Sequence, residues 1–178
     1  MKAKSGFTLV EILIVVVILG ILAAIVIPQF TSASTEAKEA ALVSDIQSIR
    51  SQIELYKIQH NDVLPGEVLQ SDGTITAATA VSFVNSMTSK TNQYGEVGTT
   101  ATHRFGPYMQ KIPGNPFSTA TAVTVADISE GASSVEIDGT AGDNSHGWNF
   151  VTTGLDRGLF QADDGLSNPV DGTAHIDY

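Results

Sequence analysis

The chain has 178 residues, a formal net charge of −10 and no cysteine. The lack of cysteine excludes disulfide frameworks, zinc ribbons and cysteine nucleophiles. Its nine basic residues are thinly scattered, so neither nucleic acid nor an anionic lipid surface is expected as a main partner. Any contact with a lipid bilayer must come from an apolar segment.

Such a segment lies near the N-terminus, where residues 7–27 are apolar except for Thr8, Glu11 and Gly20. About 20 apolar residues are enough to span a bilayer. Lysines at positions 2 and 4 precede the segment, and the positive-inside bias would keep that end in the cytoplasm. The residues after Pro28 would then lie outside the cytoplasm.

Two simple interpretations of this segment fit poorly. A cleaved secretory signal needs a small-residue cleavage site after its apolar core, but Ala23-Ala24 runs into further apolar sequence. A plain transmembrane anchor leaves Glu11 unexplained, because a carboxylate in hydrocarbon costs about 2.5 to 3.5 kcal/mol.

The stretch Lys4-Ser5-Gly6-Phe7-Thr8-Leu9-Val10-Glu11 resembles the signature of type IV prepilins. The resemblance implies that a prepilin peptidase cuts after Gly6 and N-methylates Phe7, the new N-terminus. It also implies that Glu11 pairs with the amino group of a neighbouring subunit in a filament. Alternatively, Glu11 only marks the chain for the peptidase or for the assembly platform.

Gly20 and Pro28 are helix-weakening residues inside one long helical pattern. Proline removes a backbone hydrogen bond and clashes with the preceding turn, so a curved or locally melted helix is expected. The alternative is simple tolerance, because transmembrane helices accept both residue types.

Beyond Pro28 the helix is predicted to continue as an amphipathic helix. One apolar stripe recurs at spacings of three and four, formed by Leu42, Ile46, Ile49, Ile53 and Tyr56. A helix from Phe7 to His60 would be roughly 80 Å long at about 1.5 Å per residue. Its first half must therefore enter a membrane or contact other subunits.

A second helix is predicted over 77–89, with Ala77, Val81 and Val84 on one side, followed by a loop over 93–102.

Residues 106–117, Gly-Pro-Tyr-Met-Gln-Lys-Ile-Pro-Gly-Asn-Pro-Phe, resemble a segment of the major pseudopilins of type II secretion systems. Asn115 and Phe117 replace the Asp and Trp of that family. The three prolines predict an extended connection from the helical half to a sheet.

In the last third of the chain, apolar and polar residues alternate as they do in β-strands. Candidate strands are 122–128, 135–138, 148–153 and 158–162, and the last two flank a predicted hairpin turn. They predict an antiparallel meander with one face on the helix stripe, and Trp148 and Phe150 in the core.

The C-terminal tail is acidic and rich in Gly, Ser and Asn. Calcium takes six to eight oxygen ligands, which such a loop can supply. The tail is loosely similar to the calcium loop of major pseudopilins, which implies the ligands Asp163, Asp164, Ser167 and Asp171. The alternative is a solvated acidic loop that binds no metal.

The sequence has no recognisable set of catalytic residues, so the chain is not predicted to be an enzyme. The four histidines are expected in loops or at the surface. The predicted fold is α+β and type IV pilin-like: one very long N-terminal helix packed on an antiparallel sheet. The expected parts are a cleaved leader (1–6), a membrane and filament-core helix half (7–30) and a periplasmic domain (31–178).

The resemblance implies a single-pass inner-membrane protein that polymerises into a periplasmic pseudopilus for type II protein secretion. Its partners would be the prepilin peptidase, identical and related pseudopilins, the assembly platform and the bilayer. One alternative is a surface type IV pilus subunit acting in adhesion, motility or DNA uptake. A remoter one is a membrane-tethered binding domain that uses the prepilin export route.

Overall fold

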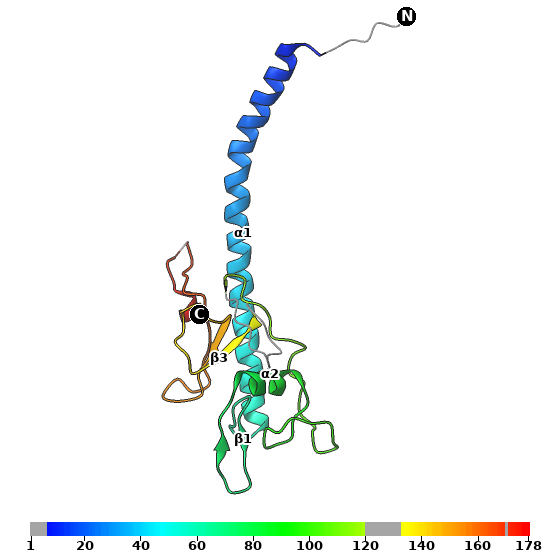
Figure 1. Cartoon of the computed structure of the whole chain (residues 1–178), viewed down its shortest axis with the longest axis vertical. Helices are drawn as coiled ribbons and strands as arrows, with labels where there is room; N and C mark the ends of the chain where they lie inside the picture. The colour runs from blue at the N-terminus through cyan, green and yellow to red at the C-terminus, as the bar shows by residue number, and fades with distance from the viewer. Residues whose placement is uncertain (1–6, 120–132, 170) are drawn as a thin grey trace, which may run out of the picture. The chain divides into compact units, whose positions relative to one another are not determined.

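The computed structural model describes residues 7–119, 133–169 and 171–178. It divides into two compact units, Met1–Glu39 and Ala40–Tyr178. The helix α1 (Leu9–Gln59) begins in the first unit and ends in the second (Figure 1). A long N-terminal helix followed by a small sheet confirms the predicted α+β, pilin-like class.

The helix α1 ends where the sequence predicted. Asn61 and Asp62 follow it with φ of 54° and 66°, a left-handed conformation that cannot continue the helix. The Asp62 N–H donates to the Lys57 carbonyl at 2.9 Å, which caps the last turn. Upstream, α1 remains helical through Gly20 and Pro28, so the structure does not show the local melting considered above.

The predicted stripe forms the centre of the second unit. Its five members are at most 1% exposed: Leu42, Ile46, Ile49, Ile53 and Tyr56. They pack in one cluster with Phe83, Trp148, Phe150 and Phe160. The amphipathic half of α1 is therefore the central element of this unit's core.

A short antiparallel hairpin and a second helix follow α1. The hairpin pairs β1 (Val68–Leu69) with β2 (Ile75–Thr76). The helix α2 (Ala80–Thr88) starts later than predicted because Thr79 and Ser82 form a capping box. Its buried apolar residues are Phe83, Val84 and Met87, so the predicted face was right only at Val84.

The C-terminal sheet has the order β3 (Val135–Ile137), β4 (Trp148–Phe150), β5 (Phe160–Ala162). The β4–β5 hairpin is antiparallel, as predicted, and Trp148 and Phe150 are fully buried. The short 3₁₀ helix η2 (His175–Asp177) follows the sheet. The predicted strand over 122–128 lies outside the described residues.

The prediction of a wholly antiparallel meander was wrong at β3 and β4, which pair in parallel. Residues 138–147 carry the chain back to the level at which β3 began, so that β4 runs in the same direction. Asp138 makes this return possible, with φ at 52° and a side chain that accepts the backbone N–H groups of Thr152 and Thr153. Alternation of apolar residues does not reveal such a connection.

Candidate processing and assembly site

Thr8 and Glu11 cap the N-terminus of α1. The Thr8 side chain accepts the backbone N–H of Glu11 at 3.2 Å, and the Glu11 carboxylate accepts the Thr8 N–H at 2.8 Å. The Thr8 hydroxyl also donates to Glu11 at 2.7 Å. This reciprocal pair is a capping box, and it satisfies donors that a helix start otherwise leaves unpaired. The sequence signal for such a cap is Thr-x-x-Glu before an apolar run, and residues 8–11 carry it.

Every large apolar side chain from Phe7 to Phe30 is exposed, from 41% at Val26 to 85% at Phe7. Burying one such side chain contributes about 1.5 to 3 kcal/mol. An apolar surface of this extent marks a membrane-contacting or protein-contacting segment. In length and composition, α1 is also sufficient to cross a membrane.

Among the other residues predicted for processing and assembly, Phe7, Gly20 and Pro28 belong to this surface or adjoin it. Gly6 falls outside the described residues, and Phe7 is the residue before the cap. A Cβ added at Gly20 would meet nothing within 4 Å in the described structure, so the glycine leaves a shallow point on the helix surface. Pro28 lies inside α1 and is exposed.

The predicted calcium ligands Asp163 and Asp164 are both buried, but they face different partners. Asp163 Oδ1 accepts the backbone N–H groups of Gly142 and Asp143 at 2.7 and 3.1 Å. Its Oδ2 accepts the backbone N–H of His146 at 2.9 Å. Asp163 therefore organises the turn that precedes β4.

Asp164 is enclosed by donors from three segments. Its Oδ2 accepts the Asn115 side-chain amide at 2.8 Å. Its Oδ1 accepts the Leu166 backbone N–H at 2.9 Å and lies 2.8 Å from Nδ1 of His175. The Asp164 and His175 side chains are 0% and 1% exposed.

In the described structure, the carboxylates of Asp164 and Asp171 already accept hydrogen bonds from protein groups. The Asn115 side-chain amide and the His175 imidazole both lie against the Asp164 carboxylate. Ser167 and Asp171 are exposed, and Asp171 accepts the Thr173 N–H within its own turn. Calcium at these residues stays a prediction.

Residues 106–117 connect the helices to the sheet, as predicted. Tyr108 donates its hydroxyl to the Gln59 side chain at 2.5 Å, and its N–H donates to the Met87 carbonyl of α2 at 2.9 Å. The Trp148 indole N–H donates to the Pro113 carbonyl at 2.8 Å. The segment that resembles the pseudopilins thus has a structural role in the core of the second unit.

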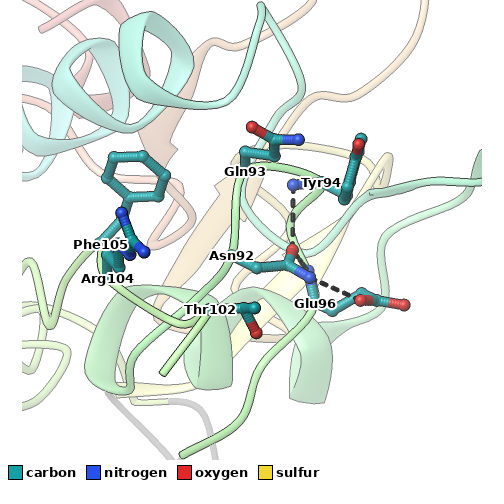
Figure 2. A pocket seen from close by; sticks show the side chains of 7 residues that line it. All are labelled: Asn92, Gln93, Tyr94, Glu96, Thr102, Arg104 and Phe105. Carbon is teal, nitrogen blue, oxygen red and sulfur yellow. Dashed lines mark hydrogen bonds between the residues drawn. The ribbon is translucent and has the colours of Figure 1, made fainter. Parts of the chain in front are cut away.

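A pocket of about 440 Å³ lies in the loop that follows α2 (Figure 2). Several of its polar groups bond within the loop. The Asn92 side-chain amide nitrogen donates to the Glu96 carboxylate at 2.6 Å, and the Asn92 side-chain oxygen accepts the Tyr94 backbone N–H at 2.9 Å. They stabilise the loop rather than converge on the pocket, so the arrangement gives little support to a ligand-binding domain.

Two of the four histidines depart from the surface placement that the sequence suggested. His60 is 0% exposed and stacks on Tyr56, with ring centroids 3.8 Å apart. His175 is 1% exposed and lies beside Asp164. The available signal was the spacing of Tyr56 and His60, four residues apart, which continues the buried stripe by one turn.

The comparisons with known proteins agree with the N-terminal signature. Residues 1–27 match the family model described as the prokaryotic N-terminal methylation motif. The chain therefore carries an N-terminal methylation motif of the prepilin type. It is 48% identical over 59 residues to type II secretion system core protein G of Pseudomonas aeruginosa, covering 33% of this chain and 42% of that protein.

A longer match involves the core protein G of Aeromonas hydrophila, with 29% identity over 84% of this chain and 95% of that protein. A fimbrial protein of P. aeruginosa is 38% identical over 42% of this chain and 44% of its own length. Several matches thus span less than half of the relative, including the one at 48% identity. No solved structure matches significantly.

Proposed function

We propose that this prepilin-like chain is a structural subunit of a type II secretion pseudopilus, processed after Gly6 and polymerised through α1. The observation that carries the proposal is the exposed apolar surface of residues 7–30, at whose start Thr8 and Glu11 form the helix cap. A subunit held in a bilayer covers this surface with lipid. A subunit in a filament covers it with the helices of its neighbours.

In this proposal the chain performs no catalysis. It is the substrate of a prepilin peptidase, which leaves Phe7 as an N-methylated terminus. The chain is held in the inner membrane with its first residues in the cytoplasm and the second unit in the periplasm. Its further partners are related pseudopilins and an inner-membrane assembly platform.

Glu11 has two possible contributions to assembly, and they can be separated. Its carboxylate caps its own helix in the described structure. In a filament the same carboxylate would meet the Phe7 amino group of a neighbour, and in a low-dielectric core such a pair selects register. Glutamine can retain the cap, but it carries no charge.

The test compares Glu11→Val, Glu11→Gln and Glu36→Val in cells that assemble the filament. Glu36 is an exposed carboxylate on the same helix, beyond the apolar segment, so its variant is the matched control. Cleavage after Gly6 is expected in all three. Filaments are expected only from Glu36→Val. Filaments from Glu11→Gln would assign Glu11 to capping, and filaments from Glu11→Val would contradict both roles.

A surface type IV pilus subunit is the second candidate, and similarity to a fimbrial protein favours it. Both candidates predict the same processing and the same packing of α1. They differ in where the filament accumulates.

A further inference from the structure

One face of the C-terminal sheet carries polar side chains that the core does not use. The register aligns Glu136 of β3 with Asn149 of β4 and Gln161 of β5, on the face opposite Trp148 and Phe150. Asp163 continues this face beyond β5, and its N–H donates to the Gly147 carbonyl. Gly147 has no side chain, which leaves space on this face.

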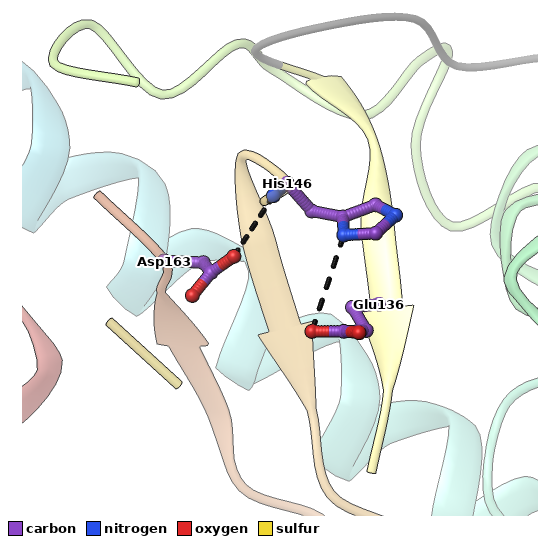
Figure 3. Close-up of side chains that lie close together, drawn as sticks. All are labelled: Glu136, His146 and Asp163. Carbon is purple, nitrogen blue, oxygen red and sulfur yellow. Dashed lines mark hydrogen bonds and ion pairs between the residues drawn. The ribbon is translucent and has the colours of Figure 1, made fainter. Parts of the chain in front are cut away.

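Three metal-ligating side chains from three segments meet beside this space (Figure 3). One carboxylate oxygen each from Glu136 and Asp163 and one ring nitrogen of His146 all lie within 4.8 Å of one another. His146 Nδ1 is 3.9 Å from Glu136 Oε2. The backbone N–H of His146 holds Asp163 Oδ2 at 2.9 Å, which fixes the position of that oxygen.

The Ser145 hydroxyl lies among these three groups. Its oxygen is 2.9 Å from His146 Nδ1, 3.3 Å from Asp163 Oδ2 and 3.4 Å from Glu136 Oε2. Four atoms that could bind a metal therefore surround one position: two carboxylate oxygens, one imidazole nitrogen and one hydroxyl oxygen. In a tetrahedral zinc site with bonds of about 2.0 to 2.2 Å, the ligand atoms are about 3.4 Å apart. The distances here approach that arrangement.

A second observation is the Asn149 carbonyl oxygen. Asn149 is 1% exposed and lies next to Glu136 on the same face. Its amide donates to the Gly139 carbonyl at 3.2 Å, but its side-chain oxygen has no hydrogen-bond partner within 7–119, 133–169 and 171–178. A buried acceptor next to Glu136 that lacks a protein partner is expected to meet a water or an ion.

We propose that Glu136, His146 and Asp163, with Ser145, form a binding site for one first-row transition-metal dication, of which zinc fits best. One imidazole and two carboxylates suit zinc better than calcium, which prefers oxygen ligands alone. The cation balances two carboxylate charges. The Glu136 and His146 side chains are 29% and 23% exposed, so solvent reaches the site. By joining β3, the 142–146 turn and the end of β5, the metal would stabilise the sheet edge.

The site is tested by zinc titration of the full chain in detergent, with calcium and magnesium titrated in parallel. Calorimetry should give one zinc per chain. Trp148 is the only tryptophan and lies two residues from His146, so cobalt bound at the site should quench its fluorescence. Glu136→Gln and His146→Gln keep the side-chain size, and each should weaken zinc binding at least about tenfold.

His103→Ala is the matched control, because His103 bonds to Thr100 in a different loop and its loss should leave zinc binding unchanged. If one glutamine variant fails to fold, the other still decides the question. Absence of zinc binding, a preference for calcium, or unchanged zinc binding in the folded glutamine variants would overturn the proposal.

Discussion

At the scale of single residues, His60 shows how burial fixes a protonation state. Its Nδ1 lies 2.8 Å from the Tyr56 carbonyl, which can only accept, so Nδ1 carries the proton. Its Nε2 lies 2.9 Å from the Thr91 hydroxyl, which therefore donates to it. The neutral ring is thus satisfied at both nitrogens, and burial lowers the pKa of His60 below its usual 6.5.

This lowered pKa predicts a loss of stability in mild acid. In the unfolded chain His60 gains a proton as the pH falls through about 6.5, whereas in the folded chain it stays neutral to a lower pH. Its contribution is therefore complete above 6.5 and declines below it, by at most about 1.4 kcal/mol per pH unit. Melting of the full chain in detergent between pH 7.5 and 5 measures the decline.

His60→Phe is the informative variant, because its ring can still stack on Tyr56 but cannot take up a proton. Its melting temperature should be lower than that of the wild type at neutral pH, but it should depend less on pH. An equally steep decline in the variant would assign the acid sensitivity to other groups.

At the scale of elements, α1 was the part that the sequence predicted best. Its stripe could be found because one helix face repeats every three or four residues, and burial of that face dominates the core. The parallel pairing of β3 and β4 could not be found, because strand direction depends on how residues 138–147 turn. The contact between Asp164 and His175 could not be predicted either. It depends on the path that the C-terminal tail takes, and the amino-acid composition of the tail does not specify that path.

Two isoleucines on α1 give a matched test of the stripe. Ile49 is 0% exposed and Ile58 is 79% exposed, and both lie in the second unit. Ile49→Ala should lower the free energy of unfolding by about 2 to 5 kcal/mol, since it removes buried methyl groups and leaves a cavity. Ile58→Ala should change it by less than about 0.5 kcal/mol.

Urea unfolding of the two variants, followed through Trp148 in the core, measures the difference. Similar losses from both substitutions would mean that α1 is rotated about its axis relative to the described packing.

At the scale of the whole molecule, the N-terminal signature and the exposed apolar half of α1 support the same account. The signature could be found from the sequence because its residues are contiguous. The match to the methylation-motif family model covers the same residues. The Thr8-x-x-Glu11 spacing is also a capping signal, and the geometry confirms the cap. The proposed zinc site could not be predicted, because its ligands come from positions 136, 146 and 163 and meet only through the sheet register.

If the chain is a pseudopilin, it is processed after Gly6 and assembles into a periplasmic filament. Intact-mass spectrometry of the protein, taken separately from the cell envelope and from sheared surface material, tests it most directly. A processed pseudopilin should give a mass that lacks residues 1–6, carries one added methyl group and is confined to the envelope. The same mass abundant in the sheared fraction would make the chain a surface pilin, and an uncleaved mass would contradict the account altogether.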